Sequence, residues 1–239
     1  MTRSWTPPEP IARKAQAEKI HAILCNYLQS DLAGKRCLEV GCGNGEIINH
    51  LAKHTSQAMG LEINGRILRS NLIKDSRVVY IQGDGRQLPF EDDTFDIVIL
   101  AQVYEHMTRQ EMLSAEVYRV LKPGGVCFFS GPNRWQVIEP HYFLPFLAWL
   151  PGKMASAYLR VMKRGDDFDI YSRGYFKLRY LWKNFEIVDF TWQMIKDPKK
   201  FSLNHKSFRK YIINKTPICV IKLIKPLYGN YNWVLVKCK

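Results

Sequence analysis

Residues 37–45 read CLEVGCGNG, a short apolar run that ends in three glycines at alternate positions, Gly41, Gly43 and Gly45. A short apolar run of this kind is typical of a buried parallel strand. The residues that follow, 45–54, have the pattern of a helix. A glycine-rich turn between a strand and a helix lets a ligand approach the backbone closely. The segment therefore predicts the opening unit of an α/β domain, with a ligand site in its turn.

Strands and helices alternate along most of the chain. We expect helices at 11–29, 45–54, 64–75, 108–121 and 172–184, and strands at 37–41, 57–63, 77–84, 95–101, 126–132, 185–191 and 231–237. Asn64 is expected to cap one helix, and Thr108 with Glu111 gives a capping-box pattern at the next. This alternation predicts a mostly parallel sheet with helices on both faces, whose ligand lies beyond the carboxyl ends of the strands.

Regularity lapses between residues 133 and 171, a stretch rich in aromatic residues and interrupted by prolines. We predict an inserted helical lid there. The chain, 1–239, is then one domain made of an N-terminal helix (1–33), a cofactor-binding core (34–132), the lid (133–171) and a basic section that completes the sheet (172–239). Two interpretations of the apolar side chains of the lid stay open. They dip into a membrane or cover a lipid tail, or they pack against the sheet edge as a cap.

The formal net charge is +13, and it is concentrated at one end of the chain. From Lys196 onward there are eleven Lys and Arg residues and one acidic residue. Such a section favours anionic partners, either nucleic acid, acidic lipid headgroups or a phosphorylated acceptor. The first residues have no apolar signal-peptide core, and no run of eighteen apolar residues exists. We therefore expect a cytoplasmic protein, with peripheral contact to an anionic membrane left open.

The six cysteines contain no C-x-x-C pair, so neither a disulfide scaffold nor a zinc site is expected, and no metal ligands are assigned. The glycine turn also departs from the dinucleotide fingerprint, because Glu46 stands where the third glycine would be. A carboxylate there suits a cationic sulfonium ligand better than a pyrophosphate. Glu62, which ends the second strand, is placed to accept ribose hydroxyls. Asp84 is either a contact for an adenine amine or an ordinary turn residue.

Residues 37–132 resemble the class I S-adenosylmethionine-dependent methyltransferases, especially the methyltransferase type 11 group that includes quinone-biosynthesis enzymes. The resemblance lies in five motifs in the order of the family, LEVGCGNG, GLEI, GDGRQLPFEDDTFDIVIL, YEHM and RVLKPGGVCFFSGPN. It implies S-adenosyl-L-methionine as the cofactor and a Rossmann-like seven-stranded sheet whose last strand is antiparallel.

The resemblance also implies the cofactor contacts. The methionine end would meet Glu39, Gly41, Ala101 and Gln102. The turn itself would be formed by Cys42, Gly43 and Gly45. The ribose would be held by Glu62, and the adenine would be flanked by Ile63, Asp84 and Gly85.

We infer the kind of acceptor from residues that lie near the expected position of the methyl group. A histidine has a suitable pKa for a general base, so His106, after the fourth strand, and His141, in the lid, are the catalytic candidates. Tyr104 and Tyr142 are the candidate substrate contacts. The lid segment EPHYFLPFLAWLP resembles an insertion in methyltransferases of which some are linked to lipid or surface-polysaccharide synthesis.

Three hypotheses follow. The first is methyl transfer, in particular O-methylation, to a small-molecule, lipid-linked or glycan acceptor. The second is RNA methylation with the basic section as the binding surface, which is less favoured because no RNA-binding module is recognisable. The third is a non-catalytic protein that binds S-adenosylmethionine.

Overall fold

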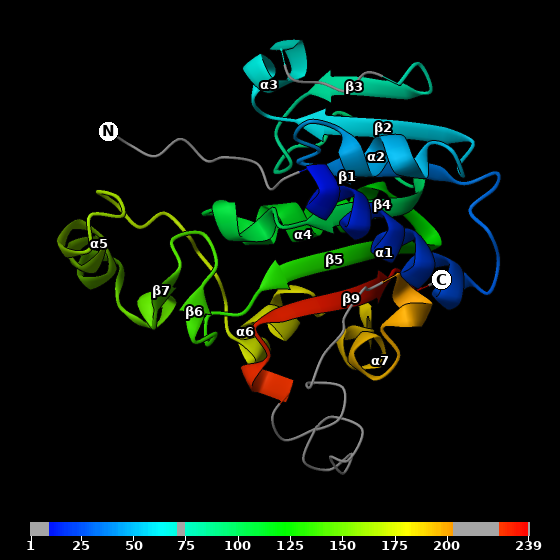
Figure 1. The fold of residues 1–239 in the computed structure, drawn as a ribbon. Coiled ribbons are helices and arrows are strands. Elements are labelled where there is room, and N and C mark those ends of the chain that lie inside the picture. Colours follow the sequence, from blue (N-terminus) through cyan, green and yellow to red (C-terminus); the bar gives the residue numbers. More distant parts are fainter. Residues whose placement is uncertain (1–9, 71–74, 203–224, 239) are drawn as a thin grey trace.

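The computed structural model describes residues 10–70, 75–202 and 225–238, and its centre is one sheet of seven strands (Figure 1). The strands are β1 (Arg36–Val40), β2 (Gln57–Glu62), β3 (Val78–Gln82), β4 (Phe95–Ala101), β5 (Leu121–Pro132), β8 (Glu186–Asp189) and β9 (Asn230–Val236). Their order is β3-β2-β1-β4-β5-β9-β8. Neighbours among β1 to β5 are parallel, and β9 is antiparallel to both β5 and β8. The predicted mostly parallel sheet with an antiparallel last strand is confirmed.

Helices cover both faces of this sheet (Figure 1). They are α1 (Pro10–Leu28), α2 (Glu46–Leu51), α3 (Gly65–Ser70), α4 (Gln110–Val120), α6 (Tyr175–Leu181) and α7 (Thr191–Lys196). Successive strand residues point to opposite faces, so Cys37 packs in the core under α1 and α2 whereas Leu38 packs in the core under α4 and α6. Both faces are therefore apolar, as the near-continuous apolar strands predicted.

Two local expectations about helix starts had different outcomes. Asn64 caps α3 as predicted, since its Oδ1 accepts a hydrogen bond from the backbone N of Arg66 at 3.0 Å. The capping box of Thr108 and Glu111 is wrong, because α4 begins at Gln110 and its N-cap residue makes no side-chain hydrogen bond. Glu111 is engaged elsewhere, in an ion pair with Arg173 that is 2.5 Å long.

Pro123, Gly124 and Gly125, which follow α4, are part of a strand. α4 ends at Val120 and β5 begins at the next residue, Leu121, so the three residues lie inside a long strand. The pairing of β4 with β5 shifts register between Phe95 and Ile97, which accommodates them.

The lid, residues 133–171, is less helical than predicted. It contains a two-stranded hairpin, β6 (Ile138–Glu139) with β7 (Leu144–Pro145), then a 3-10 turn, η2 (Leu147–Trp149), and one longer helix, α5 (Gly152–Val161). The hairpin forms because the buried carboxylate of Glu139 accepts the backbone N–H groups of His141 and Tyr142, both at 2.8 Å. Because the lid follows β5, it stands at the carboxyl edge of the sheet (Figure 1).

The lid also has a small apolar core of its own. That core consists of Leu144, Leu147, Ala155 and Leu159. Within the described ranges, none of the helices has both the length and the apolar character needed to cross a bilayer. Part of the basic section that the sequence singled out, residues 203–224, lies outside the described residues.

Candidate functional site

The glycine turn after β1 has the backbone geometry that the sequence predicted. Gly41 has φ of 72° and Gly45 has φ of 84°, the left-handed region that glycine tolerates best. A Cβ on Gly41 would lie 2.7 Å from Cγ2 of Val103, so only glycine fits there. The turn is also tied to the neighbouring strand, since the backbone N of Gly41 donates to the carbonyl of Leu61 at 2.7 Å. The turn is therefore held in one conformation, and its backbone is not covered by a side chain at Gly41.

Two buried carboxylates flank the turn. Glu39 is 2% exposed and accepts a hydrogen bond from the backbone N of Ile48 at 2.9 Å. Burial raises the pKa of Glu39 to about 8, against the opposing charge of Arg13. Glu62, at the end of β2, accepts from the backbone N of Gly43 at 3.0 Å and from that of Asn64 at 2.9 Å. The carboxylate expected to meet a ribose therefore also fixes the turn.

The residues expected to contact the adenine differ in whether their side chains already have partners. Ile63 is 60% exposed beside Glu62, which leaves an apolar surface for a flat ring. Gly85 is buried, and a Cβ there would lie 2.8 Å from Cγ1 of Val40. Asp84, in contrast, is paired with Arg86, whose Nη2 lies 2.6 Å from Oδ2. The Arg86 hydrogen bonds hold the pKa of Asp84 below its usual value, so an adenine amine would have to share this carboxylate with Arg86.

Ala101 and Gln102 end β4 beside the turn. Ala101 is buried. Gln102 has φ of 61°, and its amide nitrogen donates to Ser130 Oγ and to Asn230 Oδ1, both at 3.1 Å. The Gln102 side chain is therefore held against β5 and β9, and its backbone is the part left to pass beside a bound ligand.

This arrangement fits an adenosine ligand that carries a cationic group. The strand ends supply a carboxylate for hydroxyl groups at Glu62, an exposed apolar side chain at Ile63, and a glycine turn between them. The turn is followed by Glu46, in the first turn of α2, whose carboxylate would repel a phosphate group.

On the acceptor side, the structure brings the two catalytic candidates together from distant segments. His106 lies on a 3-10 turn after β4, η1 (Tyr104–His106), and His141 lies in the loop between β6 and β7. Their ring centroids are 5.2 Å apart and nearly perpendicular. Burial, and then the charge of His141, lowers the pKa of His106. Burial opposes the charged form of His141, but its hydrogen bond to Glu139 raises its pKa overall.

Two buried glutamates beside these histidines escaped the sequence reasoning. Glu139 is fully buried, and its Oε1 lies 2.7 Å from Nδ1 of His141. Glu105 is also fully buried, and neither of its carboxylate oxygens has a hydrogen-bond partner. Burial raises the pKa of Glu105 to about 7. One feature of the sequence could have indicated them. Each glutamate stands next to or near a histidine in the chain, in Glu105-His106 and Glu139-Pro140-His141.

The two tyrosines expected to contact the acceptor have other partners. Tyr104 is fully buried, and its hydroxyl donates to the carbonyl of Pro132 and accepts from the backbone N of Arg173. Tyr104 is thus a residue of the core, and contact with an acceptor stays a prediction for it. The hydroxyl of Tyr142 donates to Oδ1 of Asp169 at 3.1 Å, a contact within the lid. Tyr142 stays half-buried near His141.

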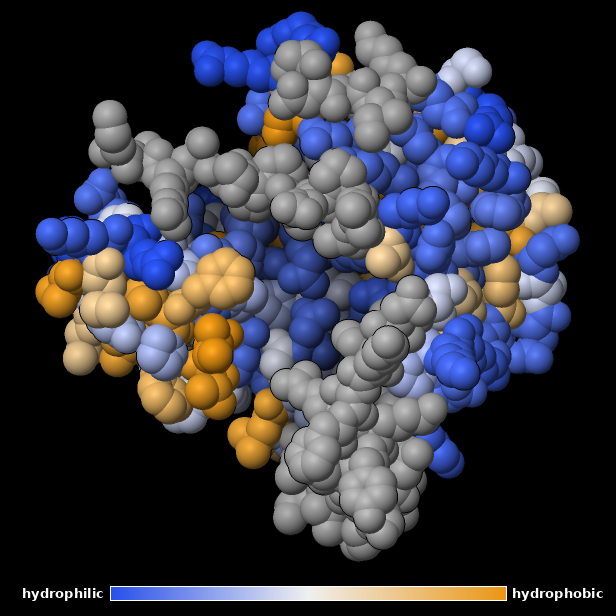
Figure 2. Space-filling view, in the orientation of Figure 1, coloured by the Kyte–Doolittle hydropathy of each residue, from blue (hydrophilic) through white to orange (hydrophobic). Residues whose placement is uncertain are grey.

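The outer surface of the lid is apolar and exposed. Figure 2 shows apolar side chains gathered over β6, β7 and α5, next to a hollowed area with hydrophilic side chains. Phe143 is 71% exposed and Val161 is 78% exposed. The other large exposed apolar side chains of the lid are Trp135, Val137, Ile138, Phe146, Trp149, Met154 and Met162. Leu144 and Leu147 are buried instead, in the core of the lid. Both interpretations of the lid therefore stay predictions.

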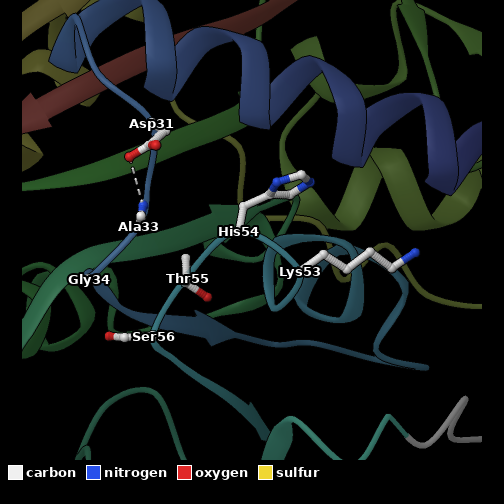
Figure 3. A pocket seen from close by; sticks show the side chains of 7 residues that line it. All are labelled: Asp31, Ala33, Gly34, Lys53, His54, Thr55 and Ser56. Carbon is white, nitrogen blue, oxygen red and sulfur yellow. Dashed lines mark hydrogen bonds between the residues drawn. The ribbon is translucent and has the colours of Figure 1, made fainter.

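A separate surface hollow of about 360 Å³ lies away from this site (Figure 3). Its lining comes from residues 31–34, which precede β1, and 53–56, which precede β2. The amino ends of these parallel strands lie at the edge opposite the glycine turn, so the hollow is not the ligand site of the turn.

The chain is similar to known proteins over the same half that holds the glycine turn. Residues 38–129 match the model of a family described as a methyltransferase domain. A phthiotriol/phenolphthiotriol dimycocerosates methyltransferase of Mycobacterium tuberculosis is 35% identical over 130 residues, covering 50% of this chain and 47% of that protein. A fatty-acid O-methyltransferase of Mycolicibacterium smegmatis is 34% identical over 124 residues, covering 49% of this chain and 42% of that protein. These relatives are thus matched over less than half of their own length.

The fold is similar to that of solved structures over nearly the whole chain. A phosphoethanolamine N-methyltransferase 2 of Haemonchus contortus, solved with S-adenosyl-L-methionine, superposes with a TM-score of 0.54 at 19% identity. The superposition covers 93% of this chain and 52% of that one. At this level of identity, the likeness concerns the fold.

Proposed function

Because residues 38–129 form a class I S-adenosylmethionine-dependent methyltransferase domain, with S-adenosylmethionine as its cofactor, we propose that the chain methylates a hydroxyl group of a small-molecule, lipid-linked or glycan acceptor. The observation that carries the proposal is the convergence of Glu105, His106 and His141 at the carboxyl edge of the sheet, below a lid with an exposed apolar surface. A hydroxyl acceptor needs such groups, because its proton must leave during methylation.

On the donor side, the bound cofactor supplies an activated methyl group on a sulfonium. Glu62, which fixes the turn through Gly43, would accept hydrogen bonds from the ribose. The adenine would be held by Ile63 and by Asp84, which it would share with Arg86. The amino group of the methionine end would be held by Glu39 and Gly41. Residues that hold the cofactor in this way would orient its methyl group, and orientation supplies much of the rate of an in-line displacement.

On the acceptor side, the hydroxyl lies against His106 and His141. Since burial and His141 lower the pKa of His106, its ring is neutral near pH 7 and can accept the hydroxyl proton. His141 is held in place by Glu139, which fixes the orientation of its ring.

The lid favours a lipid-type acceptor among the three classes. Its exposed apolar side chains lie beside exposed cations, namely Lys153, Arg160, Lys163 and Arg164. Such a surface suits an acyl chain with an anionic headgroup, or the interface of an anionic membrane. Two relatives point the same way, a fatty-acid O-methyltransferase and a phthiotriol/phenolphthiotriol dimycocerosates methyltransferase. No observation of comparable kind favours RNA, because residues 203–224 lie outside the described part of the chain.

The experiment is methyl transfer from labelled S-adenosylmethionine to an extract separated into lipid, small-molecule, glycan, RNA and protein pools. We expect label in the lipid pool. A Phe143→Ser, Phe146→Ser double variant should lower that transfer at least about fivefold while cofactor affinity is unchanged. The matched control is Val79→Ser, which changes a side chain that is 54% exposed on β3, away from the lid.

Label only in RNA or only in protein would reject the proposed acceptor class. A chain that binds S-adenosylmethionine with normal affinity but labels none of the pools would favour the non-catalytic alternative.

A further inference from the structure

We infer that Glu105, His106 and His141 hold a divalent transition-metal ion, which binds the hydroxyl oxygen of the acceptor. The inference rests on the proposed methyl transfer to a hydroxyl group and deepens it. It differs from the expectation drawn from the sequence, which assigned no metal ligands.

The first observation is the geometry of the three side chains. One ligand atom from each lies within 4.8 Å of the others. Small rotations of these side chains would bring them to the distances of about 2.0–2.2 Å at which nitrogen and oxygen ligands hold a metal such as zinc. Glu105 and His106 come from the turn after β4, whereas His141 comes from the lid hairpin, so the site joins the catalytic core to the lid.

The second observation is the state of Glu105. Its side chain is fully buried, yet neither oxygen has a hydrogen-bond partner. A buried carboxylate without a partner is costly, and buried charges in proteins are paired or bind metals. None of the ion pairs found among the described residues includes Glu105, and the nearby basic group that acts on it is the ring of His141. A cation between Glu105 and the two rings would supply the missing partner.

The third observation is the support behind His141. Oε1 of Glu139 lies 2.7 Å from Nδ1 of His141, and Glu139 is fully buried and also accepts two backbone N–H groups. This carboxylate fixes the proton on Nδ1 and leaves Nε2 as the nitrogen that can bind a metal. Histidine ligands of metals usually have such a partner behind them.

The ligand set indicates which ion fits. Two imidazoles and one carboxylate favour zinc, iron, cobalt or manganese over magnesium, which prefers oxygen ligands alone. Three protein ligands leave further coordination positions open. Because the His106 side chain is exposed, an acceptor can reach the ion from that side.

With the ion bound, His106 is a ligand and not the base. The metal lowers the pKa of the bound hydroxyl, as it does for bound water, and the proton passes to solvent. The hydroxyl oxygen then forms its bond to the methyl carbon, the carbon–sulfur bond breaks, and the sulfur keeps the electron pair.

The test is titration of the chelator-treated full chain with Co²⁺, followed by calorimetry and by visible absorption. A second group, His21, His50 and His54, also has ligand atoms within 4.8 Å of one another. All titrations are therefore made in the His54→Ala background, which disables that group. Binding of S-adenosylhomocysteine is measured in every variant as a readout of the folded cofactor site.

We expect one Co²⁺ to bind with a visible absorption band. Glu105→Gln and His141→Ala should each weaken binding at least about tenfold, and Glu139→Gln should weaken it about 10–100-fold, the usual effect of a residue behind a ligand. Affinity for S-adenosylhomocysteine should not change. Two ligand variants are used so that a folding defect in one does not decide the result.

The inference is overturned if the His54→Ala protein binds no Co²⁺. It is also overturned if Glu105→Gln and His141→Ala, made in that protein, both bind Co²⁺ with unchanged affinity. Normal binding of S-adenosylhomocysteine with no metal binding would overturn only this inference and leave His106 as the base. Failure to bind S-adenosylhomocysteine would instead count against the proposed function.

Discussion

Oε2 of Glu62 lies 3.0 Å from the backbone N of Gly43, so the carboxylate at the end of β2 holds the glycine turn that follows β1. The same side chain accepts a second backbone hydrogen bond, from Asn64. One residue therefore has two functions, as a ribose acceptor in the proposed complex and as a brace for the loop in the free protein.

Replacement of Glu62 should have a larger effect on cofactor affinity than replacement of Asp84. Hydrogen bonds to charged groups contribute about 1.5–3 kcal/mol, so Glu62→Ala should weaken S-adenosylhomocysteine binding roughly 10–100-fold. Asp84→Asn should weaken it less, because that carboxylate is shared with Arg86. Calorimetric titration of both variants measures this difference, and equal losses would contradict it.

Gly131 should be a sensitive position for stability. A Cβ there would overlap with Cε1 of the buried Tyr104 ring. Overpacking of a core typically costs about 1–3 kcal/mol, so Gly131→Ala should lower the free energy of unfolding by at least that amount. The control is Gly152→Ala, where an added Cβ meets nothing within 4 Å. Urea unfolding of the two variants gives the comparison, and similar midpoints would refute the expected packing of Tyr104.

Tyr104→Phe should reduce stability and leave cofactor affinity intact. The change removes the hydroxyl that joins Pro132 to Arg173, and loss of a buried hydrogen-bond partner costs about 1–3 kcal/mol. Tyr180→Phe, at a side chain that is 67% exposed, should leave the unfolding free energy unchanged. A Tyr104→Phe protein with full stability but no methyl transfer would instead support Tyr104 as a site residue.

Acidification should destabilise the protein through the histidines that α1 and α2 bring together. Burial, then the charges of His54 and His50, lowers the pKa of His21, and burial likewise lowers that of His50. The unfolded state therefore takes up protons first as the pH falls through the ordinary histidine value of about 6.5. The melting temperature should drop by a few degrees between pH 8 and pH 5.5.

The His21→Gln variant tests whether these histidines cause the drop in melting temperature. His21→Gln should reduce it, because one of the titrating rings is removed. An unchanged drop in the variant would assign the acid sensitivity to other groups.

The sequence predicted the sheet well because its strands are strongly patterned. The apolar run at 95–101 and the glycines after residue 40 each allow one local interpretation, and both were confirmed in β4 and in the turn. Local patterns were wrong where a distant residue takes the expected partner. Thr108 and Glu111 read as a capping box, but Arg173, far along the chain, binds Glu111.

The acceptor side was harder to predict for the same physical reason. His106 and His141 were each visible as candidates, but nothing in the sequence shows that the lid places one ring against the other. The burial of Glu105 and Glu139 depends on packing between the lid and the core. A carboxylate in the sequence is expected at the surface, so these two residues attracted no attention before the structure placed them.

The lid leaves and rejoins the domain almost at one point, because the backbone N of Arg134 donates to the carbonyl of Arg173 at 3.2 Å. It also carries its own apolar core. A segment whose two ends meet and that has its own apolar core can be exchanged as a unit. If the proposed function holds, replacement of residues 133–171 would change the acceptor and leave the residues that bind the methyl donor as they are.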